Sequence, residues 1–328
     1  MSHAVSGGRN MKPKFRSLLA SALLFAAGTA QAQQAARIVV GFTPGGSTDV
    51  LARYLAEPFR GVLGRPVIVE NRPGAAGRLA VEAVKAATPD GNTLVLVPSG
   101  PMTLFPHIFR ELRFDPFRDF VPIVQLATQD LCIATGPGAP VKTLAELRDW
   151  ARANPQKASY GSSGAGTLQH FTGVLFAQRA GLDLTLIPYK GTTGAVTDLA
   201  AGQVPMLAVS CTELLEMHRA GRVRILASSG PVRTPFTPDV PTLKESGLDV
   251  EVTAWFGVYG PAGMSPALVG ALNKAAVNAV RTQEGKDQLF KLGFVATGTS
   301  PEELARAQRR DYELWGEAAR LSGFKPES

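Results

Sequence analysis

Short runs of aliphatic residues alternate with amphipathic stretches along the chain from about residue 36 onward. Brief apolar runs between glycine-rich or polar segments are typical of buried strands, and apolar positions three and four residues apart are typical of helices. The pattern predicts helices over 48–63, 76–87, 143–153, 265–283 and 300–320, and strands over 36–41, 66–71, 93–98, 122–127, 131–135, 158–164, 184–191, 203–210, 222–229 and 252–263. This alternation predicts an α/β fold with mainly parallel sheets flanked by helices.

Local signals support several of the predicted helix ends. Thr143 with Glu146 and Ser300 with Glu303 have the spacing of capping boxes, in which each side chain bonds the other's backbone N–H. Pro58 lies inside the first helix, where its ring removes a hydrogen bond, so we expect a kink or an early end there. The βα units form two series, which fit two lobes.

The N-terminus has the layout of a secretory signal peptide. Lys12, Lys14 and Arg16 precede a short apolar run, and Ala30–Ala32 supplies the small residues that a signal peptidase requires. The apolar run is too short for a stable membrane anchor. We therefore expect an exported, periplasmic protein with a leader over 1–32, cleaved after about Ala32, and Met11 is an alternative start.

Charge and cysteine content narrow the function further. The predicted leader holds four basic and no acidic residues, so its removal leaves 30 basic against 27 acidic residues, a net charge of about +3. No basic run with interleaved aromatic residues is present, so we expect no nucleic-acid partner. Cys132 and Cys211 each lie in an apolar run, from which we predict two buried thiols rather than a disulfide.

Two glycine-rich turns each follow a predicted strand and open a predicted helix. They span Thr43–Asp49 and Tyr160–Thr167. A helix N-terminus offers unpaired backbone N–H groups and a positive dipole end, and glycine lets an anion approach closely. Ordinary tight βα turns with capping hydroxyls are the alternative for each one.

Several enzyme and cofactor classes do not fit these turns. Neither turn carries the lysine of a P-loop, and the spacing over Gly161–Gly166 reverses that of a dinucleotide fingerprint. His107, His170 and His218 form no metal-binding array, so we expect neither a metal nor a cofactor. Ser163 and His170 could pair in an exported serine hydrolase, but no third catalytic group is specified, so we assign no catalytic residue.

The order of the motifs resembles the Bug-type, TctC-like solute-binding proteins of tripartite tricarboxylate transporters. "VVGFTPGGSTDVLAR", "LGRPVIVENRPGAAG", "YGSSGAGTLQHFTGVLF", "IPYKGTTGAVTDLAAGQV" and "WFGVYGPAGM" carry the resemblance, which runs from about residue 37 to the last helix. It implies a type II periplasmic binding protein with lobe 1 over 33–127 and 251–328 and lobe 2 over 128–250. Such a protein holds a small organic acid between its lobes and hands it to integral membrane transporter subunits.

The resemblance also implies which residues bind the ligand. In relatives the two turns, a loop near Ser99 and the loop at Tyr189 face the cleft. Carried over to this chain, the expected ligand-binding residues are Phe42, Thr43, Gly45, Gly46, Ser47, Thr48, Asp49, Ser99, Ser162, Ser163, Gly164, Gly166, Thr167, His170, Tyr189, Lys190 and Ser210.

The chain departs from the family pattern at two places that bear on the ligand. Thr43 adds a hydroxyl to the first turn, and Pro205–Ser210 lacks the acidic or amide residue that many relatives carry there. We therefore expect the ligand to be a di-, tri- or aromatic carboxylate without an amino group. We also expect the protein to be a monomer. A ligand sensor that feeds a membrane receptor is the further alternative to a transport protein.

Overall fold

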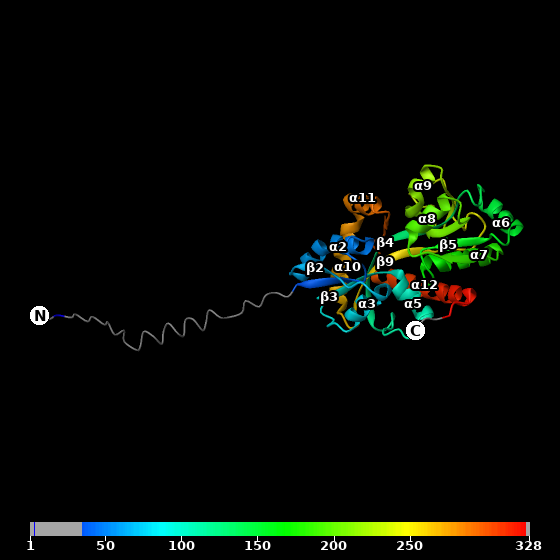
Figure 1. The fold of residues 1–328 in the computed structure, drawn as a ribbon. Coiled ribbons are helices and arrows are strands. Elements are labelled where there is room, and N and C mark those ends of the chain that lie inside the picture. Colours follow the sequence, from blue (N-terminus) through cyan, green and yellow to red (C-terminus); the bar gives the residue numbers. More distant parts are fainter. Residues whose placement is uncertain (1–2, 4–34, 326–328) are drawn as a thin grey trace. The chain divides into compact units, whose positions relative to one another are not determined.

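Strands and helices alternate along the chain in the computed structural model, which describes His3 and residues 35–325 (Figure 1). The strands are β1 Ala36–Val40, β2 Val67–Asn71, β3 Thr93–Pro98, β4 Phe120–Thr135, β5 Ser159–Ser162, β6 Thr185–Pro188, β7 Met206–Ser210, β8 Arg224–Ser228, β9 Thr253–Pro261 and β10 Val295–Ala296. The predicted leader over 1–32 lies outside the described residues, apart from His3.

Helices connect most of these strands. They are α2 Ser47–Leu63, α3 Arg78–Lys85, α4 Ser99–Thr103, α5 Phe105–Ile108, α6 Leu144–Ala153, α7 Leu168–Ala180, α8 Thr192–Ala200, α9 Leu215–Arg219, α10 Pro266–Arg281, α11 Gln283–Lys291 and α12 Pro301–Ser322, with 3₁₀ turns η1 Ala75–Gly77 and η2 Cys211–Leu214. The predicted capping box forms at Ser300, whereas Thr143 caps α6 without a complete box, because the Glu146 side chain accepts from Lys142 N–H and not from Thr143 N–H.

The strands pair in the order β2-β1-β3-β9-β4-β7-β5-β6, with β8 and β10 also paired to β4. Parallel pairs form both ends of this order, β2-β1-β3 and β7-β5-β6. The antiparallel strands β9 and β4 join the two ends. The predicted α/β fold, with two parallel sheet segments flanked by helices, is confirmed.

β4 is one strand where the sequence predicts two. Its 16 residues pair with β9 from Phe120 to Asp130, and with β7 and β8 from Leu131 onward. The polar residues 128–130 look like a loop in the sequence because they interrupt the apolar pattern. They lie where the strand changes partners, so they are half-buried within a continuous ladder.

Two helical expectations need correction. The early end at Pro58 is wrong, because α2 continues to Leu63 with Leu55 and Phe59 fully buried on either side of the proline. Burial of this apolar face outweighs the single backbone bond that proline removes. The sequence prediction also missed α11, whose first turn is capped by the Thr282 side chain accepting from Gly285 N–H at 3.0 Å.

The core divides into clusters that follow the two ends of the sheet, and α12 contributes to both. Leu304 packs with residues of α3 and β9, whereas Trp315 and Ala318 pack with residues of α6 and α7. The predicted lobe boundaries stay a prediction, but the packing shows that the last helix is shared between the two sides.

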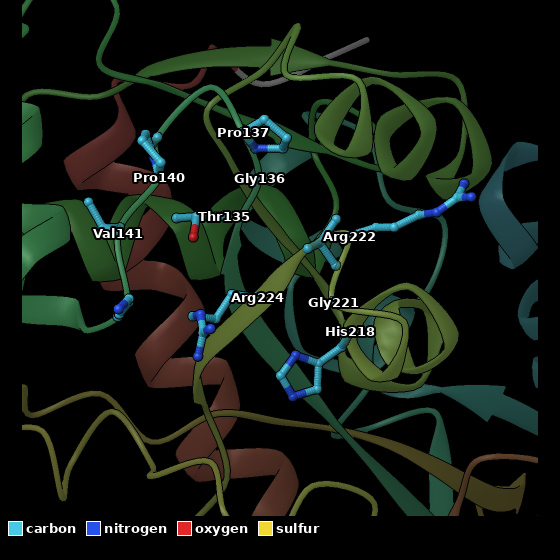
Figure 2. Close-up of a pocket in the computed structure, with 12 residues that line it drawn as sticks. Thr135, Gly136, Pro137, Pro140, Val141, His218, Gly221, Arg222 and Arg224 are labelled. Carbon is cyan, nitrogen blue, oxygen red and sulfur yellow. The ribbon is translucent and has the colours of Figure 1, made fainter.

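A recess lies at the end of β4 that is farther from β9. The loop 136–142 leaves β4 after Thr135, and together with α9 and the start of β8 it surrounds a hollow of about 410 Å³ (Figure 2). Within the loop, Ala139 N–H donates to Gly136 O at 3.0 Å and Val141 N–H donates to Ala139 O at 2.8 Å. These bonds give the loop a defined shape.

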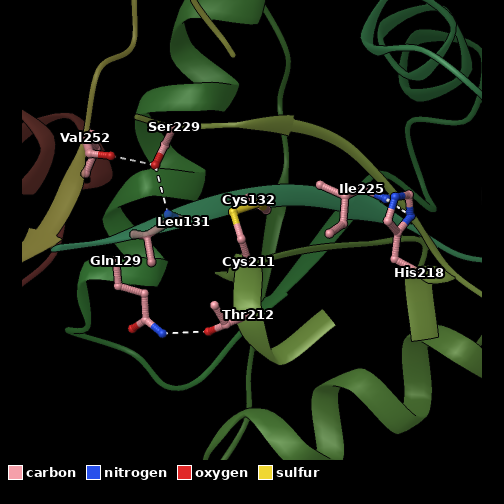
Figure 3. Close-up of a disulfide and its surroundings, with 9 residues drawn as sticks. All are labelled: Gln129, Leu131, Cys132, Cys211, Thr212, His218, Ile225, Ser229 and Val252. Carbon is pink, nitrogen blue, oxygen red and sulfur yellow. Dashed lines mark hydrogen bonds between the residues drawn. A yellow bond between two sulfur atoms is a disulfide. The ribbon is translucent and has the colours of Figure 1, made fainter. Parts of the chain in front are cut away.

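The two cysteines form a disulfide, so the prediction of two free thiols is wrong (Figure 3). Cys132 lies on β4 opposite Val209, and Cys211 follows directly after β7. This antiparallel register brings the two Cα atoms to 5.0 Å, within the range a disulfide requires. The sequence conceals the pairing because 79 residues separate the cysteines. A disulfide accords with the expected export to an oxidising compartment.

Candidate functional site

The first glycine-rich turn leaves the start of α2 open. Gly45 has φ +81, a conformation that favours glycine, and Gly46 precedes the helix in extended geometry without any side-chain cap. The first N–H groups of a helix have no partner within it. The exposed Ser47 stands at this uncapped end. An uncapped helix start of this kind can accept an anion, and the role of this turn in ligand binding stays a prediction.

Asp49, a predicted ligand residue, is engaged by the turn itself. Its Oδ2 accepts from Gly45 N–H at 3.0 Å and from Arg53 Nε at 2.8 Å, while its Oδ1 accepts from Asn71 Nδ2 at 2.9 Å. The hydrogen bond from Arg53 is the main cause that lowers the pKa of Asp49 to about 2. The buried carboxylate thus shapes the turn, and one of the expected backbone donors already has a partner.

The other predicted residues of the first turn surround this arrangement. Thr43 is exposed and Thr48 is buried in the first turn of α2. Phe42 lies with its ring against Gly77, where a Cβ would approach the ring to 3.2 Å. The close approach of Gly41 and Gly77 backbones fixes the turn against the neighbouring η1 segment.

The second glycine-rich turn satisfies most of its own polar groups. The Thr167 hydroxyl caps α7 by accepting from His170 N–H at 3.2 Å, and it donates to Gly164 O at 2.8 Å. The Ser162 hydroxyl is buried and donates to the same carbonyl at 3.1 Å. Ser163 is half-buried and its carbonyl accepts from Gly191 N–H at 2.9 Å.

His170 is a buried part of this turn. Its Nδ1 accepts from Gly166 N–H at 3.2 Å, which places the proton of the neutral ring on Nε2. Desolvation lowers the pKa of His170 to about 4. The ring packs on Phe171 at 4.4 Å and near Phe324 at 6.0 Å between centroids. A neutral, enclosed imidazole of this kind supports the turn.

Tyr189 and Lys190 differ in their surroundings. The Tyr189 hydroxyl donates to Asp198 Oδ2 at 2.8 Å, and burial together with this bond raises the pKa of Tyr189 to about 12. Lys190 is exposed. Tyr189 N–H also donates to Ser162 O at 3.0 Å, which ties this loop to the second turn.

Ser99 and Ser210 are both buried at strand ends. Ser99 starts α4 directly after β3, and Trp255 N–H points to its hydroxyl at 3.5 Å. Ser210 ends β7, and its Oγ has no hydrogen-bond partner among the described residues. A buried hydroxyl without a partner is costly, so Ser210 has an unused donor for a ligand.

The loop of Tyr189 and Lys190, predicted to face the ligand, also opens a helix. Gly191 has φ +102 and precedes α8, which begins at Thr192 without a side-chain cap. Nearby, burial raises the pKa of Glu213, while bonds from the Thr192 hydroxyl and the Ser210 backbone act in the opposite direction. Glu213 is the neighbour of this turn that the sequence analysis does not predict.

A pocket of about 560 Å³, which we call the Ser47 pocket, is lined by Ser47 and Glu213, whereas the other predicted ligand residues, including those of the second turn, do not line it. Across it, Gln129 Nε2 donates to Thr212 Oγ1 at 2.6 Å, as Figure 3 shows. Its polar and charged lining comprises Ser47, Gln129, Thr212, Glu213, Arg219 and Lys291. Glu213 supplies a carboxylate close to the end of β7, so the sequence argument against a ligand amine loses its basis.

Residues 35–325 contain neither a candidate metal site nor a candidate membrane-spanning helix. The His, Cys, Asp and Glu side chains there form no group of three that could hold a metal ion. None of the helices in this part combines the length and apolar character needed to span a bilayer.

The family model for the tripartite tricarboxylate transporter family receptor, TctC, matches residues 51–318. The chain belongs to the TctC receptor family. Protein BugT of Bordetella pertussis is 30% identical over 291 residues, which cover 88% of this chain and 89% of BugT. The Bug-type resemblance of the sequence is confirmed.

Solved structures with bound dicarboxylates share the fold. A protein of R. palustris solved with adipate has a TM-score of 0.76 and 29% identity, and the match covers 90% of this chain and 100% of that one. MatC from Rhodopseudomonas palustris with bound malate has a TM-score of 0.70 and 28% identity, covering 87% and 98%.

Proposed function

We propose that this protein is a periplasmic solute-binding receptor that captures a small organic acid between two lobes and delivers it to the membrane subunits of a tripartite tricarboxylate-type transporter. The observation that carries the proposal is the uncapped N-terminus of α2 at Ser47, which opens on the Ser47 pocket. Free N–H groups at a helix start favour an anion. The family membership supports the receptor role.

The ligand class follows from the relatives together with the donors present. The two R. palustris neighbours hold adipate and malate, both dicarboxylates. In this chain the open starts of α2 and α8 lie at the strand ends of the two predicted lobes, 33–127 with 251–328 and 128–250. We infer that one carboxylate group binds at each side, and that the Ser210 hydroxyl adds a further donor.

The energies are sufficient for useful affinity. Micromolar binding requires a net free energy of about 8 kcal/mol. Hydrogen bonds to a charged group contribute roughly 1.5–3 kcal/mol each, and a helix N-terminus adds about 0.3–2 kcal/mol. Four or five such contacts contribute roughly 6–15 kcal/mol, a range that includes the requirement, before the ordering of the ligand is subtracted. Closure of the lobes follows because only a closed state lets both turns contact one ligand.

The two alternatives receive less support from the geometry. A serine hydrolase would need His170 to accept a proton from Ser163, but the Nδ1 of His170 already accepts from Gly166 N–H and the ring is enclosed by Phe171 and Phe324. Family membership favours a transport receptor over a sensor that signals to another membrane protein.

A thermal-shift and calorimetry screen tests the proposal. The purified protein is titrated with dicarboxylates, tricarboxylates, aromatic carboxylates, amino acids and neutral sugars. We expect at least one carboxylate to bind with one-to-one stoichiometry and to raise the unfolding free energy by about 2.7 kcal/mol at a hundredfold excess over Kd. Stabilisation by a sugar alone would contradict the proposal. Retained organic-acid uptake in a deletion strain would exclude the transport role.

A further inference from the structure

We propose that the recess at the far end of β4 is a second anion site, which binds a phosphate-type dianion through Lys142, His218 and Arg224. The three side chains come from the loop after β4, from α9 and from β8, and all of them line both the hollow of about 410 Å³ and an adjoining hollow of about 530 Å³. We call the two hollows together the Arg224 recess. It shares no lining residue with the Ser47 pocket.

The side chains of Lys142 and Arg224 are exposed and form no ion pair with any described residue. Two carboxylates lie near them: Asp239 lines the adjoining hollow, and the Glu146 carboxylate accepts from the Lys142 backbone N–H at 2.7 Å. Positive charges gathered without partners favour a bound anion over a neutral ligand.

His218 is oriented as a donor. Its Nδ1 accepts from Ile225 N–H at 3.3 Å, as Figure 3 shows, so the neutral ring carries its proton on Nε2. Figure 2 shows the His218 ring beside the Arg224 side chain at the mouth of the recess. An imidazole N–H, a guanidinium fork and an ammonium group are all donors, so these three side chains favour a ligand that presents several acceptor oxygens to them.

The shape of the donor set favours a tetrahedral oxyanion. A flat carboxylate has two oxygens in one plane, and a single guanidinium can satisfy both. Donors from three separate elements instead match a group whose three or more acceptor oxygens point out of one plane. A phosphate or phosphate monoester has this geometry and carries up to two negative charges near neutral pH.

The wall of the recess is preformed. A Cβ on Gly136 would lie 2.1 Å from Leu199 O, and a Cβ on Gly138 would lie 2.8 Å from Gly202 O, so the loop backbone lies directly against the end of α8. Pro137 and Pro140 restrict the loop further. Little loop ordering is then required when an anion binds, which favours affinity.

The charges of the recess have an alternative explanation that involves no ligand. Among the described strands β8 pairs only with β4, and charged side chains on such an edge strand discourage pairing with another molecule. Arg222 provides the control that separates the two explanations. It also lines the hollow of about 410 Å³ and lies two residues from Arg224, but Figure 2 shows its guanidinium directed away from His218. A dispersed charge effect would involve both arginines equally.

The test is calorimetry with inorganic phosphate at constant ionic strength. We expect saturable one-to-one binding with Kd on the order of 0.1–1 mM. Arg224→Gln should raise Kd at least about tenfold, whereas Arg222→Gln, with the same change of net charge, should alter it less than about twofold. Equal losses in the two variants, or equally tight binding of acetate, would overturn the proposal.

Vesicles identify the source of the phosphate group. If phosphatidic acid vesicles, whose headgroup is a phosphate monoester, bind the wild type and not Arg224→Gln, while phosphatidylcholine vesicles bind neither and free phosphate is not bound, the site recognises a lipid headgroup. Absence of binding to both free phosphate and vesicles overturns the proposal. Gly46→Val must leave phosphate affinity unchanged, because loss there would place the anion in the Ser47 pocket instead.

Discussion

The two glycine-rich turns have similar sequences but use their polar groups differently. At the first turn α2 starts without a side-chain cap, and Ser47 stands exposed at its end. At the second turn Thr167 caps α7 and His170 takes the Gly166 N–H. A glycine-rich turn before a helix is therefore only a candidate for ligand binding. The residues at the cap position decide which backbone donors stay available.

The largest expected effect is on ligand binding at the first turn. Gly46 has φ −75 and a Cβ there would meet only Thr43 O at 3.4 Å, so valine can be accommodated by the fold. The added side chain would occupy the space of the anion, and we expect Gly46→Val to weaken carboxylate binding about a thousandfold, or roughly 4 kcal/mol. Gly61→Val, in the last turns of the same helix with open space around it, is the matched control. Unchanged affinity of Gly46→Val by calorimetry would refute the role of this turn.

The disulfide lies in the predicted lobe 128–250, which contains the second turn, so its loss should destabilise that region more than the first turn. Cys132→Ser combined with Cys211→Ser removes a crosslink between residues 79 apart, and we expect the free energy of unfolding to fall by about 2–4 kcal/mol. Hydrogen exchange should rise over β7 and η2 more than over the first turn. A uniform rise across both regions, measured beside the reduced wild-type protein, would show that the bond does not act locally.

The two turns should also respond to acid in different ranges. The pKa of His170 is lowered to about 4, so between about pH 6.5 and 4 the unfolded chain binds a proton that the folded chain does not, and the unfolding free energy falls as pH falls. The pKa of Asp49 is lowered to about 2, so its stabilisation is present above its ordinary pKa and is lost between about pH 4 and 2.

His170→Asn isolates the second-turn contribution. We expect denaturant unfolding of this variant to lack roughly 1–3 kcal/mol of the loss that the wild type shows between about pH 6.5 and 4. The effect of His170 is the difference in unfolding free energy between the variant and the wild type at each pH. This difference is needed because burial raises the pKa of Asp130 to about 6, so Asp130 makes the unfolding free energy rise as pH falls. Parallel pH profiles for variant and wild type would mean that His170 is not buried neutral.

The smallest effect compares the two helix starts directly. Thr167→Ala removes the cap of α7 and should lower the free energy of unfolding by about 1 kcal/mol. Ser47→Ala should change it by less than about 0.5 kcal/mol, because Ser47 caps nothing in α2. Equal losses in thermal unfolding would mean that Ser47 also stabilises its helix.

Much of the fold could be predicted because apolar periodicity reports burial directly. The strand 93–98 and the helices near 47–63 and 144–153 lie where the pattern places them. The continuous β4 was not predictable, since residues 128–130 are polar for a reason outside their own segment, the change of partner strands. The disulfide likewise depends on a register between distant strands.

The candidate site could be predicted only in outline. The glycines marked the turns, but whether Asp49 points to a ligand or back to Gly45 N–H depends on Arg53 and Asn71, which the motif does not include. Glu213 escaped notice because the 3₁₀ turn after β7 brings it near Thr192. Sequence patterns identify the segments of such a site more readily than the directions of its side chains.

The shared helix α12 also restricts how the protein can move. Gln308 accepts from the Tyr259 hydroxyl at 3.1 Å and Asp311 accepts from Trp255 Nε1 at 2.7 Å, which clamp its first half to β9. Its second half is anchored by Trp315 among residues of the other side. A helix whose two halves pack against different sides of the protein resists bending at its midpoint. We therefore expect the two sides to open and close by a small rotation about the axis of α12 or by a small shift along it.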